Sequence, residues 1–502
     1  MRRKIFAVLG VMPEPGGFAA AKFSRTATYK SYQDWVMELT EEGAERFYQT
    51  IYFQYGHASI ADLAHVMVVF ENISMPARHL LLDDQLIDAQ SRSTRFVDYS
   101  KCCFIAPPEI KKDKELLKLF RTTCKESVKL YALVSNQVAQ LYEKKFLCKK
   151  PPQMTEEDGR RIVKVRAIDV ARYLLPCASP KSMGIIASGR TWERITTKFL
   201  SSPLLEFQQI GKQLQTAICK KQAFNPSLIK IEATEWLSKK QKEELKKAIA
   251  GKNIALPTLV KYAQRNEYPG NLYQKLEEFL PKLKIEEEPD GLRGVNMYQA
   301  DPQLDFVTTL FYRISPFSYG QLLGAIKKMD SSFIKKVIDL VYSFRGDHDP
   351  VVKEAASTAL TFDICMDIGG FRDLHRHRNC VHILKPISPI YGFDIPAEVE
   401  EVGLGKRYWQ VMKKMEDAYW KLEKKYPGVG EYILPQATRK RFLMKISPWE
   451  LQYVSELRSR PQGHFSYREI SYLMYKRFAE KYPAWAKHIR VTDPKIVDFF
   501  KR

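Results

Sequence analysis

The sequence lacks a cysteine framework and any apolar run long enough to cross a membrane. Its eight cysteines show no scaffold spacing, and Cys102 and Cys103 are adjacent, which is typical of a reducing compartment. The apolar run at 5–12 is soon interrupted by prolines, so it is too short to predict a signal peptide. A chain of 502 residues can bury a core without disulfides. We therefore expect a cytoplasmic protein of two or three domains that spans no membrane.

Acidic side chains are too few to balance the basic ones. Lys and Arg number 80 against 58 Asp and Glu, which gives a formal net charge of +22 and favours anionic partners. Nucleic acid, phosphorylated metabolites and folate-type carboxylates all qualify as such partners. The sequence contains no nucleic-acid recognition motif, however, and the lysines at 238–247 are mixed with glutamates, as on a solvated helix face. Binding of nucleic acid is therefore the least favoured of these alternatives.

One short stretch, 371–379, carries three arginines and two histidines directly after an apolar segment. In that segment, 360–366, apolar residues alternate with others, which predicts a half-buried strand that ends where Gly369 and Gly370 break the pattern. A helix after the break would place Arg372, His375 and Arg376 on one cationic face. Guanidinium groups suit phosphate, and imidazole suits a flat heterocycle. The stretch therefore indicates a site for an anionic, ring-bearing cofactor.

Two other interpretations of this stretch stay open at this point. It could be a basic surface turn, because clusters of basic residues are often only solvated. It could also hold a metal, because His375, His377, Cys380 and His382 are closely spaced. The interleaved arginines would repel a cation, and the spacing fits no common zinc pattern. We therefore expect no metal.

The chain also contains a repeat. The segment Tyr173-Leu-Leu-Pro176 recurs as Tyr432-Ile-Leu-Pro435, and a long helical pattern precedes each, at 115–146 and 408–426. A β-branched run at 65–70 predicts a strand in the first half. The predicted organisation is a first copy at 1–222, a Lys/Glu-rich helical connector at 223–317 and a second copy at 318–502.

Several short motifs resemble those of one family. The first copy has Gly56-His57-Ala58-Ser59, then Ser93-Thr94-Arg95-Phe96, then the segment Val170–Pro176 and Arg190, and the second copy has Arg376-His377-Arg378. In order and type these resemble the motifs of the flavin-dependent thymidylate synthases. The resemblance implies an α+β fold in two tandem copies, each with mixed helices and a central antiparallel sheet.

Neither copy carries the whole signature of that family, which is Arg-His-Arg, seven further residues and a serine. The first copy keeps Ser93 but has Asp83-Asp84-Gln85 in place of Arg-His-Arg. The second copy keeps Arg-His-Arg and has Pro386 in place of the serine. Likewise, the arginine before the Leu-Pro pair is Arg172 in the first copy and Glu431 in the second. The losses are complementary, so the resemblance implies composite sites built from both copies.

The resemblance also assigns roles to individual residues. The phosphate of dUMP would be bound by Ser93, Arg95 and Arg172. Arg458, matched in the first copy only by Lys198-Phe199, would bind the pyrimidine of dUMP and polarise it as the catalytic residue. FAD would be bound by residues of both copies: Arg376, His377, Arg378, His57, Ser59 and Arg190.

The implied function is reductive methylation of dUMP to dTMP, with FAD as cofactor and 5,10-methylenetetrahydrofolate and NADPH as co-substrates. The family is homotetrameric with sites between subunits, so a homodimer of this two-copy chain would mimic the tetramer. Asp83 and Asp84 would repel an anionic cofactor from the remaining sites. The alternatives are a non-catalytic flavin- or nucleotide-binding relative and a basic nucleic-acid-binding protein.

Overall fold

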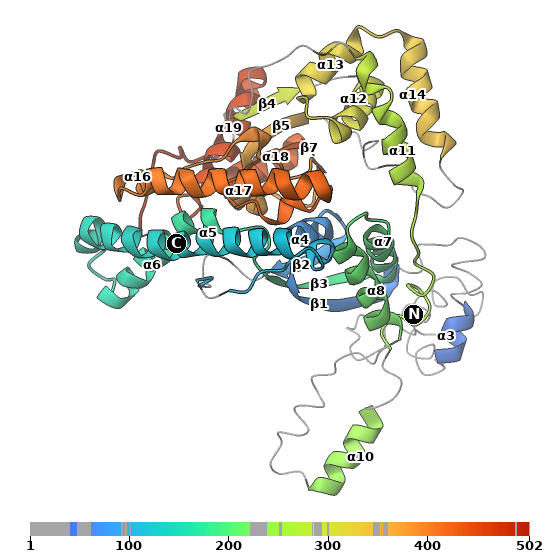
Figure 1. The fold of residues 1–502 in the computed structure, drawn as a ribbon, viewed down its shortest axis with the longest axis horizontal. Coiled ribbons are helices and arrows are strands. Elements are labelled where there is room, and N and C mark those ends of the chain that lie inside the picture. The colour runs from blue at the N-terminus through green and yellow to red at the C-terminus, as the bar shows by residue number, and fades with distance from the viewer. Residues whose placement is uncertain are drawn as a thin grey trace, which may run out of the picture. The chain divides into compact units, whose positions relative to one another are not determined.

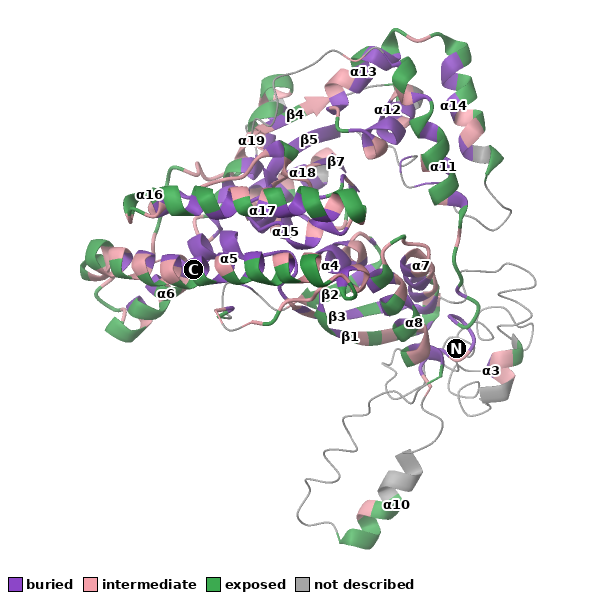
Figure 2. Ribbon diagram, in the orientation of Figure 1, coloured by how far each residue is buried: buried purple, intermediate pink, exposed green. Residues whose placement is uncertain are grey.

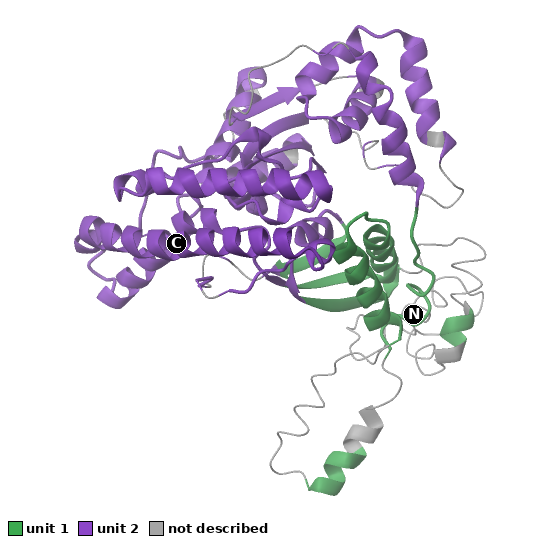
Figure 3. Ribbon diagram, in the orientation of Figure 1, with its two compact units in different colours: residues 1–70, 86–90, 183–266 green, residues 71–85, 91–182, 267–502 purple. Residues whose placement is uncertain are grey.

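A computed structural model of the protein divides the chain into two compact units (Figures 1 and 3). Unit 1 comprises 1–70, 86–90 and 183–266, and unit 2 comprises 71–85, 91–182 and 267–502. The structure describes residues 41–47, 62–91, 94, 98–100, 102–220, 238–249, 254–283, 285, 294–298, 301–344, 352, 354, 360–486 and 489–500.

A three-stranded sheet of order β1-β3-β2 is central to unit 1. Its strands are β1 (His65–Ile73), β2 (Ile87–Ser91) and β3 (Lys181–Ser188). Ser188 ends β3 and caps the next helix by accepting a hydrogen bond from the backbone of Thr191. The helices of this unit are α3 (Glu41–Phe47), α7 (Gly189–Leu200), α8 (Leu205–Cys219) and α10 (Lys239–Ile249). The strand predicted at 65–70 is confirmed as part of β1.

Unit 2 contains a four-stranded antiparallel sheet of order β4-β5-β7-β6. The strands are β4 (Gly294–Tyr298), β5 (Leu360–Asp367), β6 (Val381–Leu384) and β7 (Arg439–Ile446). Helices α15 (Ile368–Leu374), α18 (Pro448–Arg458), α19 (Phe465–Lys481) and α20 (Pro483–Ala486) accompany it. One apolar core joins this sheet to α15, α18 and α19. The protein is thus a mixed helix and sheet structure with small sheets.

The same order of elements occurs twice along the chain (Figure 1). Strand β1, α4 (Met75–Leu82), β2, α5 (Lys114–Phe146), η5 (Arg172–Leu174), β3, α7 and α8 occur in this order in the first half, with a helix at Glu156–Ala171 and two 3-10 turns between them. Strand β5, α15, β6, α17 (Gly405–Lys425), η9 (Gly430–Tyr432), β7, α18 and α19 do so in the second. The strand order β1-β3-β2 likewise matches β5-β7-β6. The two halves of the sequence therefore form corresponding elements.

The repeated Tyr-Leu-Leu-Pro and Tyr-Ile-Leu-Pro segments pair with each other inside unit 2, and we call this pairing the seam. Pro176 lies opposite Pro435 in an antiparallel bridge. On either side, the Cys177 amide donates to the Leu434 carbonyl at 2.8 Å, and the Gln436 amide donates to the Leu175 carbonyl at 3.0 Å. The hydrogen bonds are symmetric about the two prolines, so each residue of one segment has a counterpart in the other.

The two long helices that precede these segments pack together in the same unit. Helices α5 and α17 lie side by side (Figure 1), and side chains of α5, α6 (Glu156–Ala171) and α17 share one apolar core. The helix α5 begins at the cap Asp113, which accepts a hydrogen bond from the Leu116 amide at 3.0 Å. Lys414 of α17 pairs with Glu126 of α5 at 3.0 Å. The helix predicted at 115–146 is confirmed, and helix packing reinforces the seam.

The predicted helical connector at 223–317 also contributes a strand. Strand β4 pairs with β5 from Gly294↔Cys365 to Tyr298↔Thr361. Helices α11 (Tyr268–Glu277), α12 (Pro302–Ile314), α13 (Tyr319–Lys327) and α14 (Ser331–Ser343) form a core that includes Val381, Ile383 and Leu443 of the sheet. Shorter elements complete unit 2: η3 (Pro108–Ile110), η4 (Leu147–Lys149), η6 (Leu280–Lys282), η8 (Pro389–Tyr391) and α16 (Ala397–Glu401).

These helices explain why β5 is buried on both faces and is not the half-buried strand that its alternation predicts (Figure 2). One face packs against α18 and α19. On the other face, the Asp363 carboxylate accepts a hydrogen bond from the Tyr312 hydroxyl at 3.1 Å and from the Tyr319 amide at 3.0 Å. Asp363 therefore does not face water, because its partners come from α12, from α13 and from Arg441 of β7.

The prediction that Gly369 and Gly370 separate a strand from a following helix is wrong, because both residues lie inside α15. The helix starts at the cap Asp367, whose Oδ1 accepts from the Gly370 amide at 2.6 Å, and it ends at Leu374. His375 and Arg376 are therefore beyond the helix, and the predicted helical face of Arg372, His375 and Arg376 is wrong. Arg372 and His375 are buried, whereas Arg376 is exposed.

Among the described residues, no helix combines the length and apolarity that a membrane span requires.

Replacing Gly370 by alanine should destabilise the protein. A Cβ at this position would clash with the Ser466 side chain and approach the Met366 Cε to 2.8 Å, because α15 lies against α19 there. Such overpacking costs about 1–3 kcal/mol, measurable as a lower free energy of unfolding in urea. Gly324→Ala is the matched control: this helical position has no atom within 4 Å of an added Cβ. The free energy of unfolding of Gly324→Ala should rise by up to about 1 kcal/mol, because alanine has a higher helix propensity than glycine. Equal effects at the two positions would contradict the packing argument.

Candidate anion-binding site at the seam

Four basic side chains are buried around the seam in unit 2, and we call Arg78, Arg172, Lys181 and Arg372 the cationic cluster. Their exposed fractions are 1%, 2%, 1% and 5% in that order. Helix α4 carries Arg78, the turn η5 begins with Arg172, β3 begins with Lys181, and α15 carries Arg372. Arg372 comes from the second repeat and the other three from the first, so the cluster depends on both halves of the chain.

Arg372 joins the two halves directly. Its Nη1 donates to the Thr94 hydroxyl at 2.7 Å and to the Gln436 amide oxygen at 3.2 Å. The Arg78 Nη2 donates to the Ser91 hydroxyl at 3.4 Å. The Lys181 ammonium lies 4.7 Å from the centre of the Tyr99 ring. These contacts hold the side chains in place, but none of them involves a carboxylate.

Several donors of the cluster have no hydrogen-bond partner among the described residues. They are the Nε and Nη1 of Arg78, the Nε and Nη2 of Arg172, the Nζ of Lys181 and the Nε of Arg372. Among the described residues, the Asp169 Oδ1 lies 3.9 Å from the Arg172 Nε, and the charge of Asp373 acts on Arg78 and Arg372. Burying a cation without a counter-ion costs several kcal/mol. A bound anion with several oxygens would satisfy these donors, so the cluster is a candidate site for a phosphate or similar group.

Burial and mutual repulsion make the cluster electrostatically strained. Burial, followed by the neighbouring Arg372 charge, holds the pKa of Arg78 well below its usual value. The same two causes lower the pKa of Lys181. Burial and the charge of Arg172 lower the pKa of Arg372 to about 10. An anion at the cluster would relieve this repulsion.

The Arg-His-Arg run borders the cluster. The Arg376 charge contributes to the lowered pKa of both Arg78 and Arg372, after burial. Its side chain is 39% exposed, and its Nε lies 3.7 Å from the Asp373 carboxylate. Arg378 is half-buried. The interpretation of the run as a solvated surface turn is therefore wrong for its histidines, which are buried, but fits Arg376.

His377 is held between two residues of α18. The Arg458 Nε donates to the His377 Nε2 at 2.9 Å, so Nε2 is an acceptor and the proton is on Nδ1. Nδ1 then donates to the Glu450 carboxylate at 3.3 Å. Burial lowers the pKa of His377, and the hydrogen bond to Glu450 opposes that shift. The ring is thus neutral with a fixed orientation, beside a guanidinium whose Nη groups have no hydrogen-bond partner among the described residues.

The structure brings together some of the sequence-predicted residues. Arg172 is in the cationic cluster, and Arg376, His377, Arg378 and Arg458 lie on the same unit. Arg190 belongs to unit 1, where its Nη1 lies 3.3 Å from the Asp62 carboxylate. Four predicted residues lie outside the described residues: His57, Ser59, Ser93 and Arg95.

The sequence analysis missed Arg78 and Lys181 and gave Arg372 no role of its own. A signal for Lys181 was present, because it follows Pro176 by five residues just as Lys440 follows Pro435. Among the described residues, no group of three or more His, Cys, Asp or Glu side chains could hold a metal ion.

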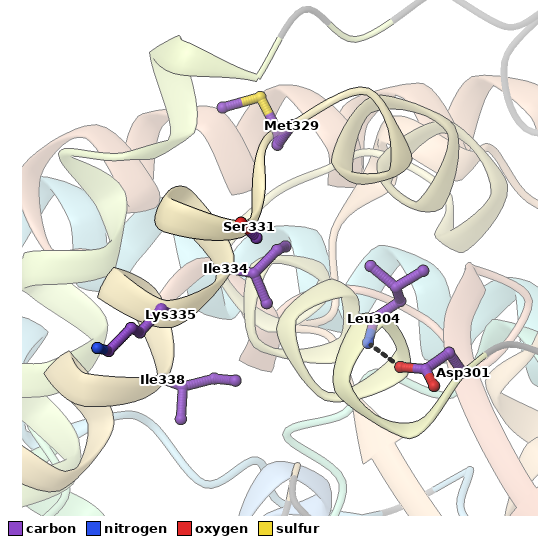
Figure 4. Close-up of a pocket in the computed structure, with 7 residues that line it drawn as sticks. All are labelled: Asp301, Leu304, Met329, Ser331, Ile334, Lys335 and Ile338. Atoms are coloured by element: carbon purple, nitrogen blue, oxygen red, sulfur yellow. Dashed lines mark hydrogen bonds between the residues drawn. The ribbon is translucent and has the colours of Figure 1, made fainter.

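A pocket of about 440 Å³ lies elsewhere in unit 2, between α12 and α14 (Figure 4). Asp301 and Leu304 line one side, and Ile334, Lys335 and Ile338 line the other. None of the residues predicted from sequence is among its lining residues, so this pocket does not coincide with the cationic cluster.

The fold and the cluster define a protein with two corresponding halves and a candidate anion site where they meet. The family model described as thymidylate synthase complementing protein (Thy1) matches residues 12–221 and 316–484. These two segments amount to more than half of the chain. The chain therefore belongs to this family, which is that of the flavin-dependent thymidylate synthases. The resemblance found in the sequence is thereby confirmed.

The similar proteins fall into two groups. A "UPF0159 protein" of Chlamydia muridarum is 25% identical, with 91% of this chain and 82% of that protein covered. The UPF0159 protein Ta1429 of Thermoplasma acidophilum is 24% identical, with 91% and 90% covered. A flavin-dependent thymidylate synthase of Clostridium tetani is 26% identical over 38% of this chain and 74% of its own length. The crystal structure of the Helicobacter pylori flavin-dependent thymidylate synthase with FAD and dUMP is 13% identical, covers 41% of this chain and 89% of its own, and has a TM-score of 0.24.

The stability of the protein should fall on acidification partly because of His79. This side chain is 4% exposed, neither ring nitrogen has a hydrogen-bond partner among the described residues, and burial followed by the Lys440 charge holds its pKa well below the usual value. Below pH about 6.5 the unfolded chain takes up a proton that the folded state refuses, so the free energy of unfolding drops by up to about 1.4 kcal/mol per pH unit.

His79→Leu should remove this share of the pH dependence, measured by urea unfolding from pH 8 to pH 5. The control is His65→Leu at an exposed position of β1. A slope in His79→Leu as steep as that of the wild type would show that His79 does not cause the effect.

Proposed function

We propose that this chain is a flavin-dependent thymidylate synthase that converts dUMP to dTMP with 5,10-methylenetetrahydrofolate and NADPH. The observation that carries the proposal is the cationic cluster. Buried donors without partners stand at the contact of the two segments that match the family. A nucleotide phosphate has the charge and the acceptor oxygens that such donors require. We infer that the chain is a tandem duplication whose two copies build one composite site.

In this proposal the cluster binds the phosphate of dUMP. Arg172 and Arg372 approach it from the two repeats, and Thr94, held by Arg372, is the sequence neighbour of Ser93 and Arg95. Those last two remain phosphate ligands in the proposal. Arginines suit this task because they stay protonated at any working pH.

The residues of the Arg-His-Arg run fit a flavin. Arg376 is exposed, with its guanidinium available to an anionic cofactor, and His377 presents a neutral ring of fixed orientation. FAD, when bound, supplies the reducing chemistry. Arg378 would contribute a further cation, and Arg458, anchored by His377 through its Nε, would turn its Nη groups to the pyrimidine and stabilise charge that develops there. His57, Ser59 and Arg190 remain proposed flavin ligands.

A homodimer and a cytoplasmic location stay part of the proposal. The cationic cluster itself is assembled within one chain, so its formation does not require a second subunit. Co-expression of Arg95→Ala and Arg376→Ala chains would show whether the flavin part is supplied by the partner. Restored turnover in the mixed dimer would place the two parts on different chains.

Arg372→Ala should weaken dUMP binding about 10- to 100-fold, because one charge-assisted contact is worth about 1.5–3 kcal/mol. Isothermal titration calorimetry would measure the affinity of each variant for dUMP and for deoxyuridine. Deoxyuridine, which lacks the phosphate, should bind Arg372→Ala and the wild type equally well.

Two control variants sharpen this test. Arg160→Ala removes a cation at an exposed position of α6, where it pairs with Glu156, and should bind dUMP as the wild type does. Arg372→Lys retains the charge without the planar fork and should fall between the wild type and Arg372→Ala. Unchanged dUMP affinity in a folded Arg372→Ala protein would remove the basis of the proposed function.

Arg376→Ala should lower the affinity for FAD about 10-fold or more, because the dianionic cofactor would lose its charge-assisted contacts with this exposed guanidinium. Its only described ion pair is weak, so stability should change by less than about 1 kcal/mol. The measurement is the visible absorption spectrum during FAD titration, with and without dUMP, followed by a turnover assay.

Ligand binding without turnover would favour the non-catalytic relative, and salt-dependent polynucleotide binding without flavin uptake would favour the nucleic-acid-binding alternative.

A further inference from the structure

Helix α17 carries two exposed tryptophans. Of the three tryptophans whose side chains the structure describes, Trp192 is fully buried, whereas Trp409 and Trp420 are 50% and 47% exposed. A single exposed apolar side chain is ordinary, but tryptophan is large and is enriched where proteins bind one another. Two exposed tryptophans on one helix therefore indicate a surface that a partner covers.

These tryptophans share one face of α17 with two charged residues between them. Trp409, Lys413, Glu416 and Trp420 are four, three and four residues apart, which places their side chains along one side of the helix. We call these four residues the outer stripe. The Lys413 Nζ donates to the Glu416 carboxylate at 2.6 Å and lies 5.8 Å from the centre of the Trp409 ring. The charged side chains are thus held within the stripe.

The opposite side of α17 is covered by its own chain. Tyr408, Val411 and Met415 belong to the apolar core that α17 shares with α5 and α6. Lys414 pairs with Glu126 of α5 at 3.0 Å. Helix α17 is therefore buried along one side and exposed along the other (Figure 2). The outer stripe belongs to the exposed side.

The order of residues in the outer stripe indicates what covers it. From either end it reads tryptophan, a charge, the opposite charge and tryptophan. Two such helices that lie antiparallel about a two-fold axis would bring Trp409 against the partner subunit's Trp420. Lys413 would then face the partner subunit's Glu416. Each of these contacts occurs twice, so the stripe is complementary to a second copy of itself.

A further pair near the ends of α17 has the same symmetry. Lys406 precedes Trp409 by three residues and Glu423 follows Trp420 by three, so the same axis places Lys406 opposite the partner subunit's Glu423. Lys406 is exposed, and the Glu423 carboxylate is fixed by hydrogen bonds from the amides at 428 and 430, at 2.8 and 3.1 Å. Opposite charges therefore meet over about 25 Å of helix.

We propose that a second copy of this chain covers the outer stripe, with the two α17 helices antiparallel about a two-fold axis. The tryptophans supply the apolar contact, and the Lys–Glu pairs fix the register and the direction of the helices. The proposed function includes a homodimer but no interface for it. This inference assigns the interface and does not depend on the identity of the substrate.

The test measures the mass of the full-length protein in solution by sedimentation equilibrium. The wild type should form a dimer of the 58.3 kDa chain. Trp420→Glu should raise the dissociation constant of this dimer about 30-fold or more, as expected for a tryptophan at an interface. Ile496→Glu is the matched control: this residue is 60% exposed and lies outside α17, so the substitution should leave the dissociation constant unchanged.

Two charge variants test the pairing itself. Lys413→Glu and Glu416→Lys should each weaken the dimer about 10-fold or more, because each brings like charges together twice across the axis. An equimolar mixture of the two variant chains should form mixed dimers as tightly as the wild type, since every acidic side chain then meets a basic one. Recovery in the mixture is a gain of binding, so a misfolded variant cannot produce it.

A wild type that is monomeric at micromolar concentration would overturn the proposal. So would a dimer that Trp420→Glu leaves as tight as before, or a mixture of the charge variants that associates no better than either variant alone. A parallel pairing, which sets each residue against itself, would leave both single charge variants as tight as the wild type. The measurement involves neither dUMP nor FAD, so its failure and the failure of the proposed function are distinguishable.

Discussion

The antiparallel pairing of two proline-containing segments is the constraint on which the site depends. Four short backbone hydrogen bonds around Pro176 and Pro435 join the two halves of unit 2. Each segment ends a long helix region and begins a strand, so the pairing fixes where η5, β3 and β7 start. Arg172 and Lys181 flank one segment directly, while Arg372 reaches it from α15 and is held there by Gln436 of the other segment. The positions of the charges therefore follow from backbone pairing more than from side-chain packing.

Charge is distributed unequally across this symmetric backbone. On one side, buried cations lower one another's pKa and keep donors without partners. On the other, Glu431 occupies the sequence position that corresponds to Arg172. Burial of an uncompensated cation reduces stability, so the unequal pattern places the electrostatic cost of the seam at a single position. In the proposed function, an anion that binds there would recover this cost and so gain affinity without additional contact area.

Local patterns in the sequence were sufficient to predict the repeated segments, the long helix α5 and the strand β1, because each is visible within a few residues. The Tyr173 and Tyr432 segments indicated a relation between the two halves, but not that the segments touch. Burial of β5 on both faces was not predictable from its alternation, since the partners of its polar Asp363 are Tyr312 and Tyr319 of α12 and α13 and Arg441 of β7. The strand β4 was missed because its partner is β5, more than fifty residues further along the chain.

The same reasoning explains the outcome for the site. Arg172 and the Arg-His-Arg run could be found because they belong to short motifs. Arg78 and Lys181 could not, because a lone basic residue in a sequence is far more often solvated than buried. Only the three-dimensional arrangement shows that these side chains converge and lack counter-ions. The glycine pair of α15 was misjudged for a related reason: Gly370 permits close contact with Ser466 of α19, and nothing near it in the sequence indicates that neighbour.

The contact between Thr94 and Arg372 joins residues 278 positions apart in the chain. During synthesis at about 5–20 residues per second, the first half of the seam would leave the ribosome well before its partner segment exists. For that interval Arg78, Arg172 and Lys181 could still be hydrated, and the Tyr173–Pro176 segment would be an unpaired strand edge. Closing so long a loop is slow, so assembly of the seam belongs to the last stage of folding. The cationic cluster therefore lacks Arg372 in any nascent or truncated chain that ends before the second repeat.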